Sequence, residues 1–267
     1  MDQSVEIQYL RPNQILQRKK KNSIVYLPVG PLEWHGPHLP LGTDPLRAQI
    51  AAVELAREIG GVVMPTLYIG TERERSPEML KSIGFAEDDY VVGMDFPRNA
   101  LKSLYLKEEV FALVLRNYLE MLIDDWKFKN VVIVNGHGAE NHLNVIQRLR
   151  REFVETTDAK VILIMPLLNF PDNKWSHATR EETETLMAYL PESVDLSALP
   201  PQNTPLANTE WAIVDDLTFR GTPTKDFTVR DDEDPRSADP DTGREVLAET
   251  IQHLKTLITS GLHVEKT

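Results

Sequence analysis

The stretch Ser23–Asp44, SIVYLPVGPLEWHGPHLPLGTD, joins an apolar run to a loop rich in ionisable residues. The run at Ser23–Val29 is short, contains β-branched residues and ends before a glycine, which predicts a buried strand. The loop that follows has three prolines and three glycines, and it carries four ionisable side chains: Glu33, His35, His38 and Asp44. Because prolines fix the backbone and glycines permit tight turns, this loop is suited to aiming side chains. We therefore expect a metal site directly after a strand.

The rest of the chain alternates between the same two kinds of pattern. Apolar runs predict further strands at 62–69, 131–134 and 161–165. Helical periodicity predicts helices at 45–59, 106–126, 141–155, 181–190 and 244–258. Strands that alternate with helices pair in parallel, so we expect one α/β domain over residues 1–267. Its architecture should be a three-layer sandwich with a mostly parallel sheet covered by helices on both faces. Residues 199–240, rich in Pro, Asp and Thr, should form a long surface excursion.

Composition excludes several classes of function. The chain has no cysteine, which rules out disulfides, iron–sulfur clusters, thiolate zinc sites and a cysteine nucleophile, so a metal would need oxygen and nitrogen ligands. The formal net charge of −12 argues against nucleic-acid binding, and the one basic run, Arg18–Lys21, is expected to be a solvated loop. The N-terminal residues lack the apolar segment of a signal peptide, and no apolar run reaches the roughly 18 residues of a membrane helix. We expect a soluble, cytoplasmic protein with no membrane or nucleic-acid partner.

Two predicted strands end beside possible metal ligands. Glu33 and His35 follow the first strand, and His137, within NGHG, follows another. Functional groups collect at the carboxyl ends of strands in open α/β sheets. Alternate side chains of an extended segment share a face, so Glu33 and His35 can reach neighbouring ligand positions. Each pattern alone also arises by coincidence on a surface, but together with Asp44 they favour a site. Nitrogen and carboxylate ligands suit zinc, manganese or iron, and a bridging carboxylate suits two ions.

A third segment, WSHATREETETLM at 175–187, adds His177 and Glu182. Glu182 should lie in the first turn of a helix. Glu181 and Glu182 could equally be acidic residues favoured there by the helix dipole, above all Glu181. Four histidines remain: we expect His38 to support the site or the fold, His142 to lie on a helix surface, and His253 and His263 to be incidental.

Four segments resemble a known family in the same order along the chain. LPVGPLEWHGPHLPLGTD (27–44) resembles the first signature of the creatininase (creatinine amidohydrolase) family, and VVIVNGHGAEN (131–141) resembles its second. HATREETETLMAYLPESVDL (177–196) resembles its third, and DPRSADPDTGREVLAETI (234–251) resembles the segment before the family's last helix. The long first motif is specific. Each of the other motifs is weak evidence for the family alone and strong evidence when it occurs together with the first.

The resemblance implies a mostly parallel α/β fold, assembly as a homo-oligomer (trimer or hexamer), and two divalent metal ions. It also implies hydrolysis of a non-peptide C–N amide bond of a small molecule, with a metal-bridging hydroxide as nucleophile. Carried over by motif, Glu33 and His137 would hold one metal, His35 would hold the other, and Asp44 would bridge them. His177 would act as general acid or base. A catalytically inactive metal- or ligand-binding relative on the same scaffold is the alternative.

The chain departs from the family's pattern in three places. Where creatininase has a metal-binding glutamate two residues after the second-motif histidine, this chain has Ala139 followed by Glu140. Either Glu140 takes that place through a one-residue shift and Glu182 is a catalytic residue, or Glu182 reaches the second metal. Thr179 and Glu184 stand where relatives usually have glycine and serine. Trp175 lies closer to His177 than creatininase's substrate-packing tryptophan does, which argues against creatinine as the substrate. A loop between the first two motifs carries three arginines that we expect to be solvated, although they could bind a carboxylate or phosphate: Arg73, Arg75 and Arg98.

Overall fold

A computed structural model describes residues 4–82, 86–95, 101–166, 177–204, 206, 208–209, 212–213 and 232–263 of the 267-residue chain. Its helices are α1 (Pro12–Lys21), α2 (Thr43–Ile59), α3 (Pro77–Ser82), α4 (Glu108–Glu120), α5 (Glu140–Thr156), α6 (Arg180–Tyr189) and α7 (Pro240–His263). Its main strands are β1 (Ile24–Val29), β2 (Val62–Val63), β3 (Asn130–Asn135) and β4 (Lys160–Ile164). A two-stranded sheet pairs β5 (Asn208–Thr209) with β6 (Ala212–Ile213).

The four main strands form one parallel sheet in the order β2-β1-β3-β4. β1 and β3 pair along their whole length, from Ile24 opposite Asn130 to Val29 opposite Asn135. After β1 the chain adds β2 on one side, and after β3 it adds β4 on the other. The direction of winding therefore reverses between β1 and β3, the position where open α/β sheets form a crevice beyond the strand ends.

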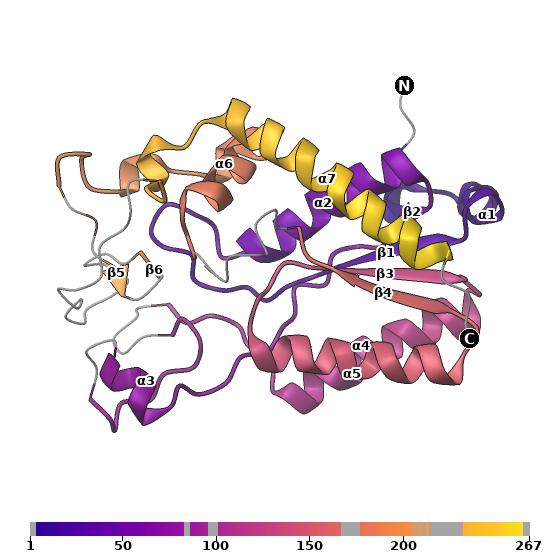
Figure 1. Ribbon diagram of the computed structural model, residues 1–267, viewed down its shortest axis with the longest axis horizontal. Helices are drawn as coiled ribbons and strands as arrows, with labels where there is room; N and C mark the ends of the chain where they lie inside the picture. Colours follow the sequence, from indigo (N-terminus) through magenta and orange to yellow (C-terminus); the bar gives the residue numbers. More distant parts are fainter. Residues whose placement is uncertain are drawn as a thin grey trace.

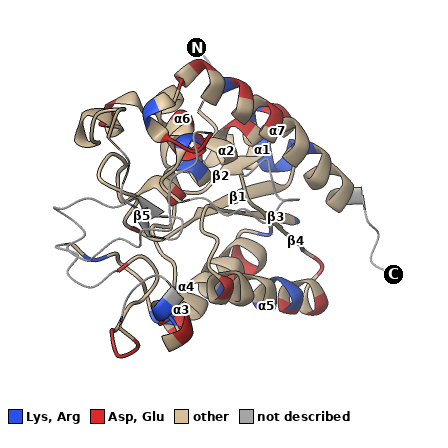
Figure 2. Cartoon of the chain, turned by 60° about the vertical axis from the view of Figure 1, so that its left-hand side comes forward, with Lys and Arg blue, Asp and Glu red and all other residues tan. Residues whose placement is uncertain are grey.

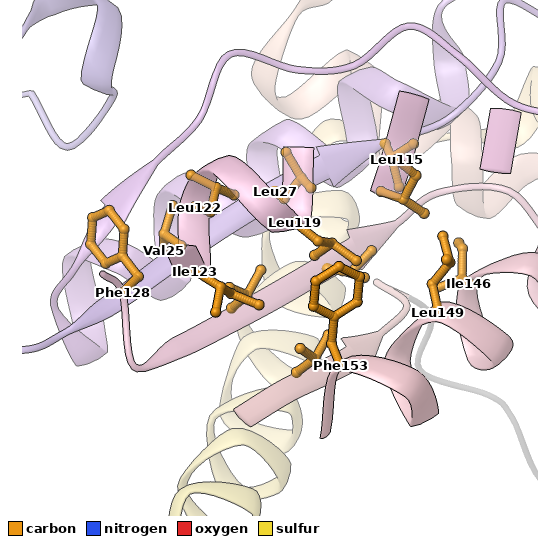
Figure 3. Packing of buried hydrophobic residues seen from close by; sticks show 14 of the residues in the cluster. Val25, Leu27, Leu115, Leu119, Leu122, Ile123, Phe128, Ile146, Leu149 and Phe153 are labelled. Carbon is orange, nitrogen blue, oxygen red and sulfur yellow. The ribbon is translucent and has the colours of Figure 1, made fainter. Parts of the chain in front are cut away.

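Helices cover both faces of the sheet (Figure 1). Helices α4 and α5 pack on one face, and α2 and α7 pack on the other. Alternate residues of β1 serve the two layers: Val25 and Leu27 face α4 and α5, whereas Tyr26 faces α2 and α7. Figure 3 shows the first of these layers, in which leucines of α4 and Phe153 of α5 meet the strand side chains. The expected three-layer α/β sandwich is confirmed.

Several boundaries differ from the sequence-based expectation. The strand expected at 62–69 pairs with β1 only at Val62–Val63, because Pro65 has no N–H to donate to a ladder, and Leu67 returns as an isolated bridge to Val29. The helix expected at 106–126 is α-helical over Glu108–Glu120 and ends in a π-helical turn, Met121–Asp125. The solvated loop expected at Arg18–Lys21 is instead the last turn of α1, where the helix dipole favours cations.

Charged residues lie mainly on the helices and loops, and β1 and β3 carry none (Figure 2). No helix in the described ranges is long and apolar enough to cross a membrane. Much of the surface excursion expected at 199–240 lies outside the described residues.

Candidate functional site

Side chains from four segments meet beyond the carboxyl ends of β1 and β3. The loop after β1 contributes Glu33 and His35, and the first turn of α2 contributes Asp44. His137 follows β3 directly. Two further residues come from the start of α6: His177, just before the helix, and Glu182, in its first turn. All six are ionisable and buried, so the fold brings together distant parts of the chain to enclose charged groups.

Asp44 lies between two imidazoles. Its Oδ1 is 3.1 Å from Nε2 of His35, and its Oδ2 is 2.9 Å from Nδ1 of His137. Because β1 and β3 are neighbours, the loops that follow them reach the same carboxylate from two sides. One carboxylate thus presents each of its oxygens to a different histidine.

Glu33 approaches the same nitrogen atoms of His35 and His137 that face Asp44. Its Oε2 is 3.4 Å from Nδ1 of His137, 3.8 Å from Nδ1 of His177 and 3.9 Å from Nε2 of His35. The hydroxyl of Tyr105 donates a hydrogen bond to Oε1 of Glu33. Tyr105 therefore fixes one carboxylate oxygen and leaves the other facing the imidazoles.

His177 is held by the first loop. Its Nε2 lies 2.6 Å from the carbonyl oxygen of Trp34, an acceptor, so this nitrogen carries the proton in the neutral ring. The unprotonated Nδ1 then faces Glu33, and the ring lies 4.1 Å from that of His35, between centroids. The next residue, Ala178, has a φ of +60°, a conformation that costs free energy for any residue except glycine and persists where the surroundings require it.

Glu182 is anchored at both carboxylate oxygens. Nη1 of Arg47 in α2 donates to Oε1 over 2.9 Å, and the N–H of Ala178 donates to Oε2 over 2.7 Å. Arg47 also pairs with Glu181 over 2.9 Å. Arg47 is buried, so it both neutralises and orients these acidic residues of α6.

The site concentrates opposite charges away from water. Burial opposes ionisation of Asp44, but His35 and His137 outweigh it and hold the pKa of this carboxyl well below its usual range. Burial also disfavours a charged imidazole, yet Asp44 beside it raises the pKa of His35 to about 9. The pKa of His137 is raised well above its usual value by Glu33 and Asp44, against the effect of burial. Burial and the adjacent His35 instead lower the pKa of His177, which keeps this ring neutral.

Glu140 lies apart from this cluster. It is the first residue of α5, its side chain is 78% exposed, and it pairs with Nη2 of Arg73 over 2.9 Å. The expected solvation of the loop arginines is wrong for Arg75, which is buried and donates through Nε to the carbonyl of Gly93 over 2.8 Å. Arg98 and Trp175 lie outside the described residues.

The expectation that His142 lies on a helix surface is wrong. His142 is fully buried in α5, where its ring stacks on Phe111 with centroids 4.4 Å apart. Its Nδ1 accepts from the N–H of Thr71, so its Nε2 carries the proton and donates to Oδ1 of Asn135 over 2.9 Å. The spacing of apolar residues in α5 does not predict that His142 is buried. The reason is that His142 contacts a polar side chain, Asn135, at the end of β3.

His38 also has a supporting position. It is buried, and its Nε2 lies 3.1 Å from Oγ1 of Thr183, which connects the first loop to α6. Burial lowers the pKa of His38 to about 4, so it is neutral.

Four residues around the site were not anticipated from the sequence. They are Arg47, Tyr105, Asn135 and the partly buried Glu72, whose pKa is raised by burial although His137 opposes the shift. The N-G-H-G motif contains Asn135, so a polar residue ending an apolar strand was a usable signal. Arg47 and Tyr105 offered none, since each acts on a residue far away in the chain.

The donor set fits divalent cations. Within the described chain, three groups of buried residues each place one donor atom apiece within 4.8 Å of one another: Glu33, His35 and His177; Glu33, Asp44 and His137; and His35, Asp44 and Glu182. The last two groups share Asp44. Buried carboxylates need positive charge, which either protonated imidazoles or cations with neutral imidazoles can supply. Nδ1 of His137 faces both Asp44 and Glu33, whereas its Nε2 is buried and has no hydrogen-bond partner in the described chain.

Comparisons with known proteins show the family through a family model and the fold through solved structures. A family model described as "Creatininase: Creatinine amidohydrolase" matches residues 8–258. The structure is similar to a crystal structure of creatinine amidohydrolase (creatininase), with a TM-score of 0.68 and 21% identity over 99% of this chain and 100% of that chain. It is similar to a structure named "Creatininase Mn" (TM-score 0.68, 21% identity, 98% and 100% covered). A variant creatininase described as Zn-Zn type gives a TM-score of 0.67 at 21% identity, with 98% and 99% covered. The search of curated proteins found no match.

Proposed function

The chain belongs to the creatininase family, and from this premise we propose that it is a dinuclear metal-dependent amidohydrolase. Its substrate would be a small molecule, and the bond cleaved a non-peptide C–N amide bond, cyclic amides included. The observation that carries the proposal is the position of Asp44, which presents one oxygen to His35 and the other to His137. A carboxylate shared in this way is suited to bridging two cations.

The two donor groups that share Asp44 define the two proposed metal positions. Glu33, Asp44 and His137 would hold one cation, and His35, Asp44 and Glu182 would hold the other. Solved relatives named with Mn and with Zn-Zn support divalent ions of this kind. Two such cations would supply an activated water and polarise the amide carbonyl.

Glu182 is favoured over Glu140 for the second position. Glu182 is buried beside His35 and Asp44, whereas Glu140 is exposed and paired with Arg73. The one-residue shift that would bring Glu140 to the site would have to break that ion pair and bury the carboxylate. Arg47 and the N–H of Ala178 hold Glu182 in place, so its carboxylate is oriented before any ligand binds.

His177 is the proposed proton-transfer residue. Its Nε2–H is bonded to the Trp34 carbonyl, which leaves Nδ1 unprotonated and facing the cluster. A neutral ring with a free Nδ1 can take a proton there and pass it to the leaving nitrogen. This residue separates the enzyme from the alternative, an inactive metal- or ligand-binding relative, because binding alone does not need a proton-transfer group.

The proposal also covers the class of substrate, the domain organisation, the assembly and the location of the protein. The departures at Ala139 and Trp175 argue for a small amide other than creatinine, recognised by the loop between Gly70 and Asn99. We further propose that residues 1–267 form a single domain, that the protein assembles as trimers or hexamers, and that it acts in the cytoplasm.

The test is a hydrolysis screen of the purified protein loaded with Mn²⁺ or Zn²⁺. Creatinine, hydantoin, dihydrouracil and linear N-acyl amines would be incubated with it, and ring-opened or amine products would be followed by mass spectrometry. We expect at least one amide to be hydrolysed, with loss of activity on chelation and recovery on adding metal. Full metal content with no hydrolysis across a broad amide library would favour the binding protein instead.

A further inference from the structure

A cavity lies at the opposite end of the sheet from the metal-ligand cluster. Its volume is about 660 Å³, and the first residues of β1 and β3 form part of its wall. In Figure 1 the end of α1 and the end of α7 lie at this end of the sheet, whereas α3 and α6 lie beyond the other end. Five lysines line the cavity, and we call them the lysine ring: Lys19, Lys20, Lys21, Lys127 and Lys129. No carboxylate is among its lining residues in the described chain.

No carboxylate of the described residues forms an ion pair with the lysine ring. None of its five ammonium groups forms an ion pair within the described ranges, whereas Lys81 and Lys255 elsewhere pair with glutamates. Lys19 donates to the carbonyl of Trp126 over 2.6 Å, and its ammonium lies 5.6 Å from the centroid of the Phe128 ring; neither contact cancels its charge. The chain has 41 acidic and 29 basic residues, so this local excess of positive charge opposes the overall balance.

The negative ends of the helix dipoles offset only a small part of this positive charge. Lys19–Lys21 lie in the last turn of α1, and Lys127 and Lys129 follow the π-helical turn that ends α4. Each helix C-terminus carries about half a negative charge. Among the described residues, the two termini therefore offset about one of five positive charges and leave roughly four.

Lys127 occupies a position where glycine would fit better. Its φ is +54°, and the N–H of Phe128 bonds back to the carbonyl of Leu122, as in a left-handed helix cap. This conformation is unfavourable for a residue that has a Cβ. This unfavourable position places one more positive charge, that of Lys127, among the residues that line the cavity.

We propose that the cavity binds a small organic molecule bearing two phosphate groups. Each phosphate monoester carries about −1.5 to −2 near pH 7, so two match the roughly four uncompensated positive charges. The cavity volume falls within the range of about 300–1,000 Å³ usual for small-molecule sites. Leu16, Ile24 and Leu262 supply apolar surface for the carbon skeleton.

Calorimetric titration of the metal-loaded protein with fructose 1,6-bisphosphate tests the proposal. We expect saturable binding at one site per chain that weakens as salt is raised. The double variant Lys127→Gly/Lys129→Gln should bind at least about tenfold more weakly, and its fold should be retained because glycine suits the backbone at 127. Lys107→Gln, which removes an exposed lysine outside the cavity, should bind like the wild type. Absence of saturable binding, or equal binding by the double variant, would overturn the proposal.

Further titrations distinguish between the possible ligands and between the possible sites. Fructose 6-phosphate and inorganic phosphate should each bind more weakly than the bisphosphate, by about tenfold or more. A second variant, Lys20→Gln/Lys21→Gln, should lose affinity in the same way, so the result does not depend on the folding of a single variant. Tighter binding of duplex DNA with increasing length would assign the lysine ring to a nucleic acid instead. Binding that disappears on metal removal but survives in both double variants would place the anion at the metal centre and contradict the proposal.

Discussion

Asn135 and His137 are joined by two hydrogen bonds in opposite directions. Nδ2 of Asn135 donates to the carbonyl of His137 over 2.5 Å, and the N–H of His137 donates to Oδ1 of Asn135 over 3.2 Å. The same Oδ1 accepts from Nε2 of His142, whose Nδ1 accepts from Thr71. The last residue of β3 therefore fixes the backbone of a proposed metal ligand, and a buried histidine fixes that residue in turn.

Replacing His142 by phenylalanine should loosen this arrangement without removing a proposed ligand. The new ring can keep the stacking on Phe111, but the buried N–H of Thr71 loses its acceptor, which costs about 1–3 kcal/mol of unfolding free energy. Metal affinity should fall about 10- to 100-fold, as is usual when a group that orients a ligand is lost. Denaturant unfolding and competition with a chelating dye measure the two effects. His253→Phe, on an exposed face of α7, is the control, and equal behaviour of the two variants would remove His142 from this role.

Gly136 lies where no side chain fits. A Cβ built there would meet the carbonyl oxygen of Asp44 at 2.1 Å, a backbone atom that cannot turn away. Gly136→Ala should therefore push β3 away from the start of α2, at a cost of about 1–3 kcal/mol or more, and weaken metal binding. Gly42→Ala is the matched control, since its Cβ would meet only side-chain atoms of Leu46 and Tyr68 at 3.4 Å or more. A Gly136→Ala protein with unchanged stability and metal content would contradict the close approach.

His177→Ala should retain both metals and lose turnover. The two donor groups that share Asp44 do not include His177, so the ions keep their proposed ligands. The rate should fall by about 10²- to 10⁴-fold, the usual contribution of general acid–base catalysis. An activated amide, whose leaving nitrogen needs less protonation, should recover part of the loss. Metal analysis together with steady-state kinetics decides the matter: loss of one metal equivalent would make His177 a ligand.

Glu140 and Glu182 should respond differently to the same substitution. Glu182→Gln should lower the occupancy of one metal position, because a buried donor beside His35 and Asp44 loses its charge. Glu140→Gln should leave metal content unchanged, because it only breaks an exposed pair with Arg73, worth about 0–1 kcal/mol. Elemental analysis measures the metal content of both variants. If Glu140→Gln loses metal and Glu182→Gln does not, the assignment is reversed.

Much of the fold follows from short-range pattern. The apolar run at Ser23–Val29 and the one before Asn135 predict β1 and β3, and strand–helix alternation predicts their parallel pairing. The outcome differs from this expectation at two places, each for a local reason. The segment after Val63 leaves the sheet at Pro65, and the basic run at Arg18–Lys21 ends a helix.

Only part of the site could be predicted from the sequence in the same way. Loops after adjacent parallel strands must approach each other, so a meeting of Glu33 and His35 with His137 could be anticipated. The choice between Glu140 and Glu182 could not, because it depends on Arg47 reaching across from α2. The burial of His142 likewise depends on Asn135, which lies seven residues earlier on another element.

The metal content of the wild-type protein and of Asp44→Ala tests the central claim most directly. Both proteins would be reconstituted with Mn²⁺ or Zn²⁺, passed through a desalting column and analysed by inductively coupled plasma mass spectrometry, with circular dichroism to confirm that each is folded. We predict two equivalents per chain for the wild type and well below one for the variant, because both proposed positions share this carboxylate. Two equivalents retained by a folded Asp44→Ala protein, or none bound by the wild type, would contradict the account.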